Sequence, residues 1–179
     1  MELMIDLETM GNGPTACVLS LGAVLFDENG VDDAVFYGQC DLVDSAKYGK
    51  IDASTVKWWL QQEEKARQEL VHNVLSLPAM LSAFVEFLDQ SPKINGVWGF
   101  GATFDNVILR SAFNATGIPC PWHFRQDRCF RTLAAINPHI EWAPRVGTHH
   151  NAADDAKTQA LTAVKMLWPS LPQNHNPQC

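Results

Sequence analysis

The sequence lacks long apolar runs, paired cysteines and an excess of positive charge. No segment approaches the ~20 consecutive apolar residues of a membrane-spanning helix, and the N-terminus lacks the basic and hydrophobic regions of a signal peptide. The five cysteines are widely spaced and include no Cys-x-x-Cys pair, so neither a disulfide framework nor a structural zinc site is indicated. These absences favour a cytoplasmic protein without a membrane segment.

Positive charge is scarce, because 13 Lys and Arg residues face 20 Asp and Glu residues and leave a net charge of −7 at pH 7. This balance argues against a broad basic surface that holds nucleic acid by charge alone. A polyanionic partner would need local help, such as a metal site built from carboxylates.

Length and composition favour one domain. The 179 residues, 46% of them hydrophobic, fit a single globular domain. We expect this domain to span residues 1–168, since no repeat or long linker interrupts them. Residues 169–179 are expected to form a loose C-terminal tail, because they contain Pro169, Pro172 and Pro177.

The hydrophobic pattern predicts a hairpin sheet followed by alternating helices and strands. Strands are expected over Met1–Leu7, Ala16–Phe26, Val31–Cys40 and Val97–Phe100. Helices are expected over Ser54–Leu70, over Pro78–Leu88, from a cap at Thr103 to about Asn114, and over Asn151–Leu167. This order predicts an α/β fold with a mixed central sheet flanked by helices.

Two carboxylates stand two residues apart in the first strand. Asp6 and Glu8 should project from one face of this strand, while Ile5 and Leu7 project from the other. Two acids at this spacing repel each other unless a counter-charge is present, and oxygen-ligated Mg²⁺ or Mn²⁺ is the usual one. Taken alone, the pair also fits a solvated strand face.

A third acid, Asp105, opens a helix just after the strand Val97–Phe100. Open α/β sheets tend to bind ligands at this carboxyl end of their strands. An acid that only stabilises the helix dipole is the alternative for this position.

A fourth acid lies in the segment His149–Asp155, which offers a histidine five residues before an aspartate twice. His149 pairs with Asp154 in one register, and His150 pairs with Asp155 in the other. On the predicted helix the two aspartates flank the polar arc from opposite sides, so spacing leaves both registers open.

Together these residues resemble a known family. Asp6-x-Glu8, Phe104-Asp105 and a His-x-x-x-x-Asp at the start of the last helix resemble the three motifs of the DEDDh 3′-to-5′ exonucleases, the DnaQ-like family. The order and spacing of the motifs agree over almost the whole folded chain. The resemblance implies an RNase H-like fold.

The resemblance also selects a register in the third motif. The family often has Ala two residues after the histidine, as in His150-Asn151-Ala152. We therefore choose His150 with Asp155 and interpret Asp154 as a solvated or capping acid.

Three further segments are similar to the exonuclease VIII-like branch of the family, which includes the RNase AS type of exoribonuclease. They are Thr55–Trp59, Val97–Gly101 and Arg128–Leu133. Gly101 departs from the family pattern, because many members carry Asn there. This departure concerns a side-chain contact to the terminal nucleotide and not the metal site.

The resemblance implies a two-metal hydrolysis of the last phosphodiester. Asp6, Glu8, Asp105 and Asp155 would hold two Mg²⁺ or Mn²⁺ ions, with Asp6 as the ligand shared by both. His150 would be the general base, a role that suits the intrinsic pKa of histidine, ~6.5. The partner would be DNA or RNA with a free single-stranded 3′ end, and the products nucleoside 5′-monophosphates.

Other residues have a less definite place. Thr9, Met10 and Phe104 resemble positions that touch the terminal nucleotide, and core packing is an equal alternative for Phe104. Trp58 and Trp59 point roughly 100° apart on a helix, so at most one should face a substrate.

Arg128 and Arg131 could contact phosphate or pair with the surplus acids. Two other function classes stay open: a catalytically silent binding module, and a metal-dependent phosphodiesterase of dinucleotides or small nucleotides. The presence of all five chemical positions counts against the silent module. Related enzymes also make a homodimer an expectation.

Overall fold

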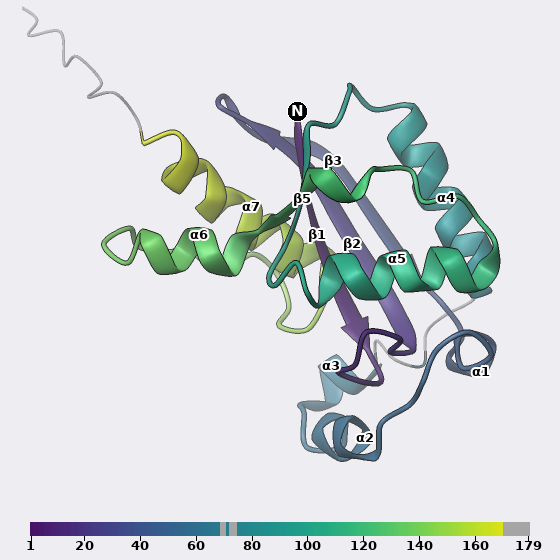
Figure 1. Ribbon diagram of the computed structural model, residues 1–179. Coiled ribbons are helices and arrows are strands. Elements are labelled where there is room, and N and C mark those ends of the chain that lie inside the picture. Colours follow the sequence, from purple (N-terminus) through teal and green to yellow (C-terminus); the bar gives the residue numbers. More distant parts are fainter. Residues whose placement is uncertain (69–70, 72–74, 170–179) are drawn as a thin grey trace, which may run out of the picture.

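A computed structural model describes residues 1–68, 71 and 75–169 of the chain (Figure 1). Its centre is a five-stranded sheet with the order β3-β2-β1-β4-β5. The strands are β1 (Glu2–Thr9), β2 (Val18–Asp27), β3 (Gly30–Gln39), β4 (Gly96–Gly99) and β5 (Asp127–Cys129). β1, β2 and β3 pair antiparallel, whereas β4 runs parallel to both β1 and β5. The predicted α/β fold with a mixed sheet is therefore confirmed.

Helices cover both faces of this sheet (Figure 1). One face packs on α4 (Leu77–Asp89) and α5 (Asp105–Thr116), and the other packs on α6 (Phe130–Ile136) and α7 (Ala152–Leu167). Shorter helices complete the described chain: α1 (Leu42–Ser45), α2 (Ala53–Trp59), α3 (Glu64–Gln68) and the 3-10 turn η1 (Phe124–Gln126). None of the helices in the described ranges combines the length and apolar character that a membrane span requires.

The strands follow from their patterns of apolar residues. β2 is buried along almost its whole length, as its nearly continuous apolar sequence predicts for a strand covered on both faces. In β1, Leu3 and Ile5 enter the core on the α4/α5 face, while Met4 enters the core on the α6/α7 face. This alternation sends Asp6 and Glu8 to the α7 side, where both line a cavity.

A close approach of α7 to the sheet depends on Gly22. This residue pairs with Asp6 across the strands, and a Cβ atom on it would lie 2.1 Å from the backbone carbonyl carbon of Ala152. Asn151 caps the helix there, because its side chain accepts hydrogen bonds from the Ala153 and Asp154 amides. The first turn of α7 is thereby held against β2, next to the strand that carries the acid pair.

Some predicted elements are wrong. The helix expected over Ser54–Leu70 is two helices, α2 and α3, and Leu70 lies outside the described residues. The chain turns after Trp59, whose indole nitrogen donates a hydrogen bond to the Thr9 carbonyl at 2.9 Å, a tertiary contact that no helical period encodes. Thr103 is not the cap of α5: Phe104 occupies that position, without a capping side-chain bond.

β5, α6 and the short helices α1 and η1 were not predicted. Of the expected loose tail over 169–179, residues 170–179 lie outside the described part of the chain.

Candidate active site

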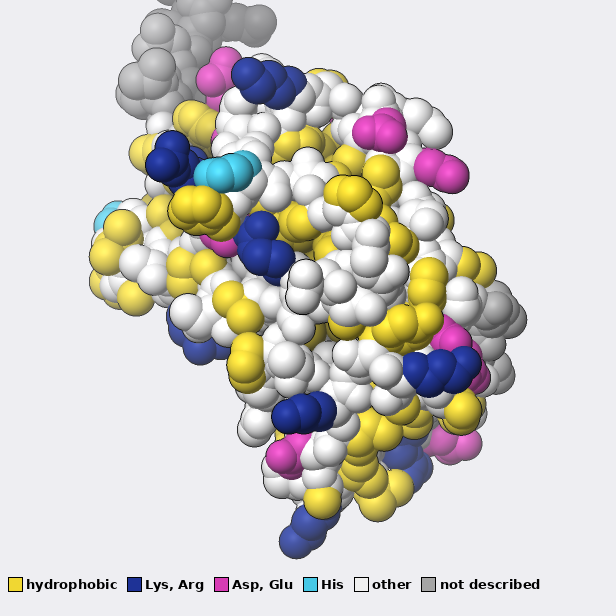
Figure 2. All heavy atoms as spheres, turned by 45° about the vertical axis from the view of Figure 1, so that its right-hand side comes forward, with side chains coloured by type: hydrophobic (Ala, Val, Ile, Leu, Met, Phe, Trp, Pro, Cys, Tyr) yellow, Lys and Arg dark blue, Asp and Glu magenta, His cyan; other side chains and the backbone are white. Residues whose placement is uncertain are grey.

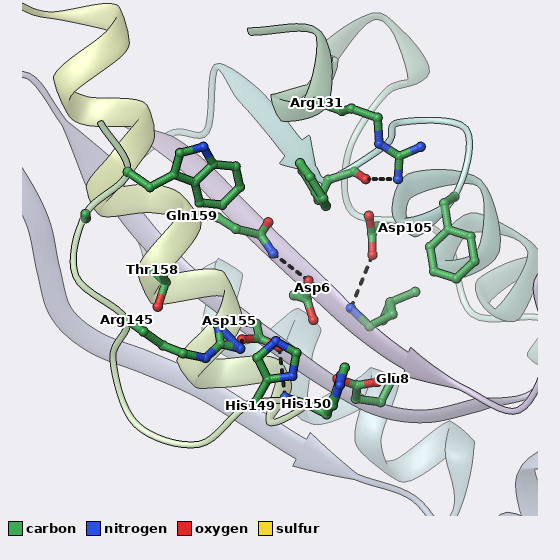
Figure 3. A pocket seen from close by; sticks show the side chains of 15 residues that line it. Asp6, Glu8, Asp105, Arg131, Arg145, His149, His150, Asp155, Thr158 and Gln159 are labelled. Carbon is green, nitrogen blue, oxygen red and sulfur yellow. Dashed lines mark hydrogen bonds and ion pairs between the residues drawn. The ribbon is translucent and has the colours of Figure 1, made fainter. Parts of the chain in front are cut away.

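Three elements bring four carboxylates to one cavity of about 480 Å³. β1 supplies Asp6 and Glu8, the first residue of α5 is Asp105, and the first turn of α7 supplies Asp155 (Figure 3). These elements come from both ends and the middle of the sequence. The site is therefore formed by the fold and not by a single segment.

Asp6 lies at the centre of this group. Burial, followed by the charges of Asp105, Glu8 and Asp155, raises the pKa of Asp6 well above its ordinary value. Gln159, one helical turn after Asp155, donates a hydrogen bond from Nε2 to Oδ1 of Asp6 at 2.7 Å and opposes this rise. The carboxylate is thus oriented by a neutral donor and is left without a cationic partner within the described residues.

Asp105 and Glu8 are also buried, and burial disfavours their charged forms. Burial raises the pKa of Asp105 to about 7, although the Leu7 amide donates to its Oδ1 at 3.3 Å. Burial, with the charges of Asp155 and Asp105, raises the pKa of Glu8 to about 8. Such a cluster of oxygen donors is stabilised by an added positive charge, which is the property of a site for hard divalent cations.

One part of the cluster has the spacing of a metal site. Ligand atoms of Glu8, His150 and Asp155 all lie within 4.8 Å of one another. His150 has a φ of 62°, a left-handed conformation that is uncommon for a residue with a side chain, and its amide donates to Oδ2 of Asp155 at 3.2 Å. The strained backbone places the imidazole beside the two carboxylates.

The His150 ring sits in a cage of other rings. It makes edge contacts with Trp58 and Trp59 at centroid distances of 5.0 and 5.9 Å, and His149 lies 3.9 Å away. Burial, then the charges of His149 and Arg145, lowers the pKa of His150 to about 4. The imidazole is therefore neutral at pH 7, and its 3.9 Å approach to Oε1 of Glu8 is not an ion pair there.

A segment without regular structure, residues 137–151, closes one side of the cavity; we call it the strap. Its amides at Ala143, Val146 and Thr148 donate to side chains on α7, at 3.0, 3.0 and 2.6 Å. The acceptors share one stripe at a spacing of four residues: Thr162, Thr158 and Asp154.

Asp154, interpreted from the sequence as a solvated or capping acid, therefore also anchors the strap. Gly147 has a φ of 58° and lies so close to this carboxylate that a Cβ would fall 2.0 Å from Oδ2. The anchored strap brings Arg145 to Oδ1 of Asp155, where the two form an ion pair.

The sequence was compared with known families, and residues 1–168 match the one described as the 3'-5' exoribonuclease Rv2179c-like domain. The chain belongs to this family. An exodeoxyribonuclease of Enterobacteria phage T4 is 27% identical over 121 residues, which are 60% of this chain and 53% of the phage protein. The chain thus spans about half the length of that curated relative.

Solved nuclease structures share the fold. The nuclease domain of 3'hExo, a DEDDh family member bound to rAMP, has a TM-score of 0.63 at 14% identity, covering 94% of this chain and 92% of that one. Cell-death related nuclease 4 has a TM-score of 0.66 at 14% sequence identity, and the match covers 92% of this chain and 62% of that one. Exonuclease X in complex with 5' overhanging duplex DNA has a TM-score of 0.59 at 13% sequence identity, and the match covers 95% of this chain and 93% of that one. These findings confirm the RNase H-like fold and the resemblance to DEDDh 3′–5′ exonucleases.

The expected substrate-binding residues of this family member divide into two groups. Phe104 lines the cavity beside Asp105. Thr9 and Met10 are 6% and 5% exposed and do not line it, and the Thr9 hydroxyl donates to the Gly11 carbonyl at 2.6 Å.

The two tryptophans differ in their exposure, and the two arginines differ in whether they line the cavity. Trp59 is buried, whereas Trp58 is 41% exposed, as expected for neighbours that point in different directions. Arg131 lines the cavity, and Arg128 instead donates to the carbonyls of Arg125 and Asp127.

Sequence reasoning missed several residues of the cavity, among them Gln159, Thr158, Arg145, Trp142 and Phe100. Gln159 stands four residues after Asp155 on a predicted helix, so its position on the same face was a usable signal. Arg145 and Trp142 lie on the strap, which has no periodic pattern that could have indicated their direction.

Proposed function

We propose that this protein is a metal-dependent exonuclease that removes nucleotides from single-stranded 3′ ends and releases nucleoside 5′-monophosphates. The observation that carries the proposal is the gathering of Asp6, Glu8, Asp105 and Asp155 in one cavity, with raised pKa values caused first by burial. Membership of a family described as 3'-5' exoribonucleases supports the direction of attack.

The four carboxylates fit two Mg²⁺ or Mn²⁺ ions, because they offer oxygen donors whose charge is only partly offset by two arginines, Arg145 beside Asp155 and Glu8 and Arg131 near Asp105. Asp6, at the centre of the group, is the ligand proposed to be shared. When bound, two such metal ions would supply an activated water and would neutralise charge on the phosphate and on the departing 3′ oxygen.

His150 is the proposed general base. Its pKa of about 4 leaves a ring nitrogen free to accept a proton at pH 7, and the strained backbone directs that ring to Glu8 and Asp155. The rings of Trp58 and Trp59 restrict the imidazole on its other side. The chain thus holds a neutral base next to the place where water would be activated.

The terminal nucleotide is assigned to the part of the cavity next to Phe104. The Phe104 side chain offers a surface for the base, while Thr9 and Met10 support this end of β1 from within the core. A cytoplasmic location and a homodimer stay predictions from the sequence.

A time course with strands labelled at either end tests the proposal. Purified protein is incubated with single-stranded RNA or DNA of one sequence, labelled at the 3′ or the 5′ end, with Mg²⁺, Mn²⁺ or EDTA. The phage relative is named for DNA and the family for RNA, so both sugars are needed. We expect a metal-dependent ladder from the 3′ end for at least one sugar.

The same assay, with dinucleotides added as substrates, separates the alternatives. Turnover of dinucleotides without attack on longer strands would indicate the small-nucleotide phosphodiesterase. Absence of cleavage under every condition, with folding verified by circular dichroism, would contradict the proposal and favour a silent binding module.

A further inference from the structure

An aromatic wall stands on the α6/α7 side of the acid cluster. It consists of Phe100 and Trp142, which meet edge to face at a centroid distance of 5.7 Å. The fully buried Phe130 packs against both, with ring centroids 5.3 Å from that of Trp142 and 5.7 Å from that of Phe100. The wall is therefore a fixed surface on a packed base.

Trp142 is more open than a core residue. It is 47% exposed, although its neighbour Phe130 is 0% exposed, and it lines the same cavity as the four carboxylates. A large aromatic side chain that is held on one edge and open on the other offers a surface on which a nucleobase can stack.

Arg131 adds a positive charge to this wall. Its guanidinium lies over the Phe100 ring, 5.0 Å from the centroid, and donates from one NH2 group to the Phe100 carbonyl at 2.8 Å. The other cavity arginine, Arg145, is paired with Asp155. The charge of Arg131 acts on Asp105, where it opposes the rise in pKa, but within the described residues Arg131 makes no ion pair with a carboxylate at 4.0 Å or less. The remaining N–H groups of its fork can therefore meet a phosphate.

The charge pattern favours such a local contact. On the face seen in Figure 2, Lys and Arg side chains are scattered among acidic, polar and apolar ones and form no continuous basic track. The net charge of −7 points the same way. A net acidic chain gives a strand little general attraction, so a cationic contact beside the acids, such as Arg131, helps to hold it there.

Phe104 and Phe100 belong to different faces of the sheet, and the Arg131 guanidinium lies close to both: a Cβ atom on Gly101 would be 3.3 Å from a terminal nitrogen of Arg131 and 3.6 Å from the Cβ of Phe104. Phe104 packs with the core cluster on the α4/α5 face, whereas Phe100 packs with the cluster on the α6/α7 face. Figure 3 shows Arg131 beside Asp105, on the side of Asp6 opposite to His150. Two aromatic surfaces, Phe104 and the wall, thus line the acid cavity, with the Arg131 guanidinium near both.

We infer that Trp142, Phe100 and Arg131 form a second nucleotide subsite, which takes the nucleotide next to the terminal one. This inference rests on the proposed function, because that function places the terminal nucleotide at Phe104. The base of the second nucleotide stacks on Trp142, and Arg131 donates to a phosphate. Since every base has a stacking face, the subsite tolerates sequence but requires an unpaired base.

Binding measured without turnover tests the subsite. The probe is a short single-stranded oligonucleotide with a 5′ fluorescein, and its anisotropy is followed with Asp6→Asn protein in Mg²⁺. Adding Trp142→Ala or Arg131→Gln should weaken binding about tenfold, as expected for the loss of one base-stacking contact or one phosphate contact. Trp142→Phe should restore most of the affinity.

Two matched controls share the chemistry but not the location. Phe124→Ala removes a 60% exposed aromatic side chain outside the cavity, and Arg128→Gln removes an exposed arginine from the neighbouring strand β5. Neither should change oligonucleotide affinity more than about twofold. Equal losses in these controls, or unchanged affinity in both Trp142→Ala and Arg131→Gln, would overturn the subsite.

Kinetics with ligands of two lengths separate this inference from the proposed function. In otherwise wild-type protein, Trp142→Ala should raise KM for the oligonucleotide far more than it raises the inhibition constant of thymidine 5′-monophosphate, a one-nucleotide product that has no group in the second subsite. An equal rise for both would show that Trp142 acts only through stability. If the wild type binds the oligonucleotide through Trp142 and Arg131 but does not hydrolyse it, the nucleotide site stands and the proposed exonuclease activity is contradicted.

Discussion

The acid cluster and the strap are two halves of one cavity that are built on opposite principles. The acids sit on regular elements, β1, α5 and α7, and carry pKa values raised by burial. The strap has no regular structure, yet its amides at Ala143, Val146 and Thr148 are bound to α7 side chains. The first half is positioned but electrostatically unsatisfied, whereas the second is satisfied by hydrogen bonds.

This difference indicates what each half needs. A cluster of buried carboxylates is stabilised only when protonated or when cations bind. The strap needs no ligand to hold its shape. We therefore expect changes in the acids to act on metal binding and chemistry, and changes in the strap anchors to act on the geometry of the cavity.

The largest effect is expected for Asp6→Asn. The exchange keeps the shape of the side chain but removes the charge of the ligand proposed to be shared, so hydrolysis should fall roughly 10³-fold, equivalent to several kcal/mol of lost transition-state stabilisation. Rates are measured on a labelled single strand in Mg²⁺. Asp33→Asn, an exposed acid on β3, is the control, and near wild-type turnover by Asp6→Asn would refute the metal assignment.

His150→Ala should follow, with a loss of about 10²- to 10⁴-fold in kcat, which is the usual range for a general base. Mn²⁺ affinity should be retained, because the carboxylates stay in place. The neighbouring His149→Ala is a matched control with a small expected effect. If His149→Ala proves the more damaging change, the register chosen for the third motif is wrong.

The strap predicts a smaller effect for Thr158→Val. Its hydroxyl accepts from the Val146 amide at 3.0 Å and donates to the Asp154 carbonyl at 2.8 Å. Losing this partner should cost about 1 kcal/mol of unfolding free energy and reduce kcat/KM severalfold, since Arg145 is displaced from Asp155. Thermal melts and steady-state kinetics measure the two effects.

Thr116→Val serves as the control for Thr158→Val. Its hydroxyl also donates to a backbone carbonyl of its own helix, Ala112 at 2.9 Å, but it lies on α5 away from the strap. A fall in stability without a fall in kcat/KM for Thr158→Val, matching this control, would show that the strap does not position the site.

The smallest effect concerns the pH dependence of stability without metal. The folded pKa values of Asp105, about 7, and Glu8, about 8, lie above their ordinary values of 3.8 and 4.5. Stability from these groups is fully present below pH ~4 and is lost as pH rises through the folded values. In EDTA, Tm should therefore fall by several degrees between about pH 5 and pH 8.5.

Asp105→Asn should flatten this pH dependence, because an amide does not ionise in the buried position. Saturating Mg²⁺ should also raise Tm of the wild type at the higher pH. A Tm that rises from pH 5 to pH 8.5 in EDTA would contradict the electrostatic description of the acid cluster.

The sequence predicts the first half of the cavity better than the second for a physical reason. The period of β1 places Asp6 and Glu8 on one face, and the end of β4 indicates Asp105. The choice of His150 with Asp155 needed the family resemblance, because helical geometry left two registers open.

The strap could not be predicted in the same way. Its course depends on hydrogen bonds to Thr158 and Thr162, which in sequence are ordinary helix residues. The break between α2 and α3 has a similar origin, since the bond from Trp59 to the Thr9 carbonyl joins segments 50 residues apart. Contacts of this kind have no local pattern.

The most direct test of the acid cluster is a calorimetric titration with Mn²⁺ near pH 7, in two buffers that differ in ionisation enthalpy. We predict that the wild type takes up two ions and releases protons, because Glu8 and Asp105 are partly protonated before binding. Asp6→Asn should lose this uptake and Asp33→Asn should keep it. An absence of saturable Mn²⁺ binding by the wild type, or uptake by Asp6→Asn equal to that of the wild type, would contradict the account.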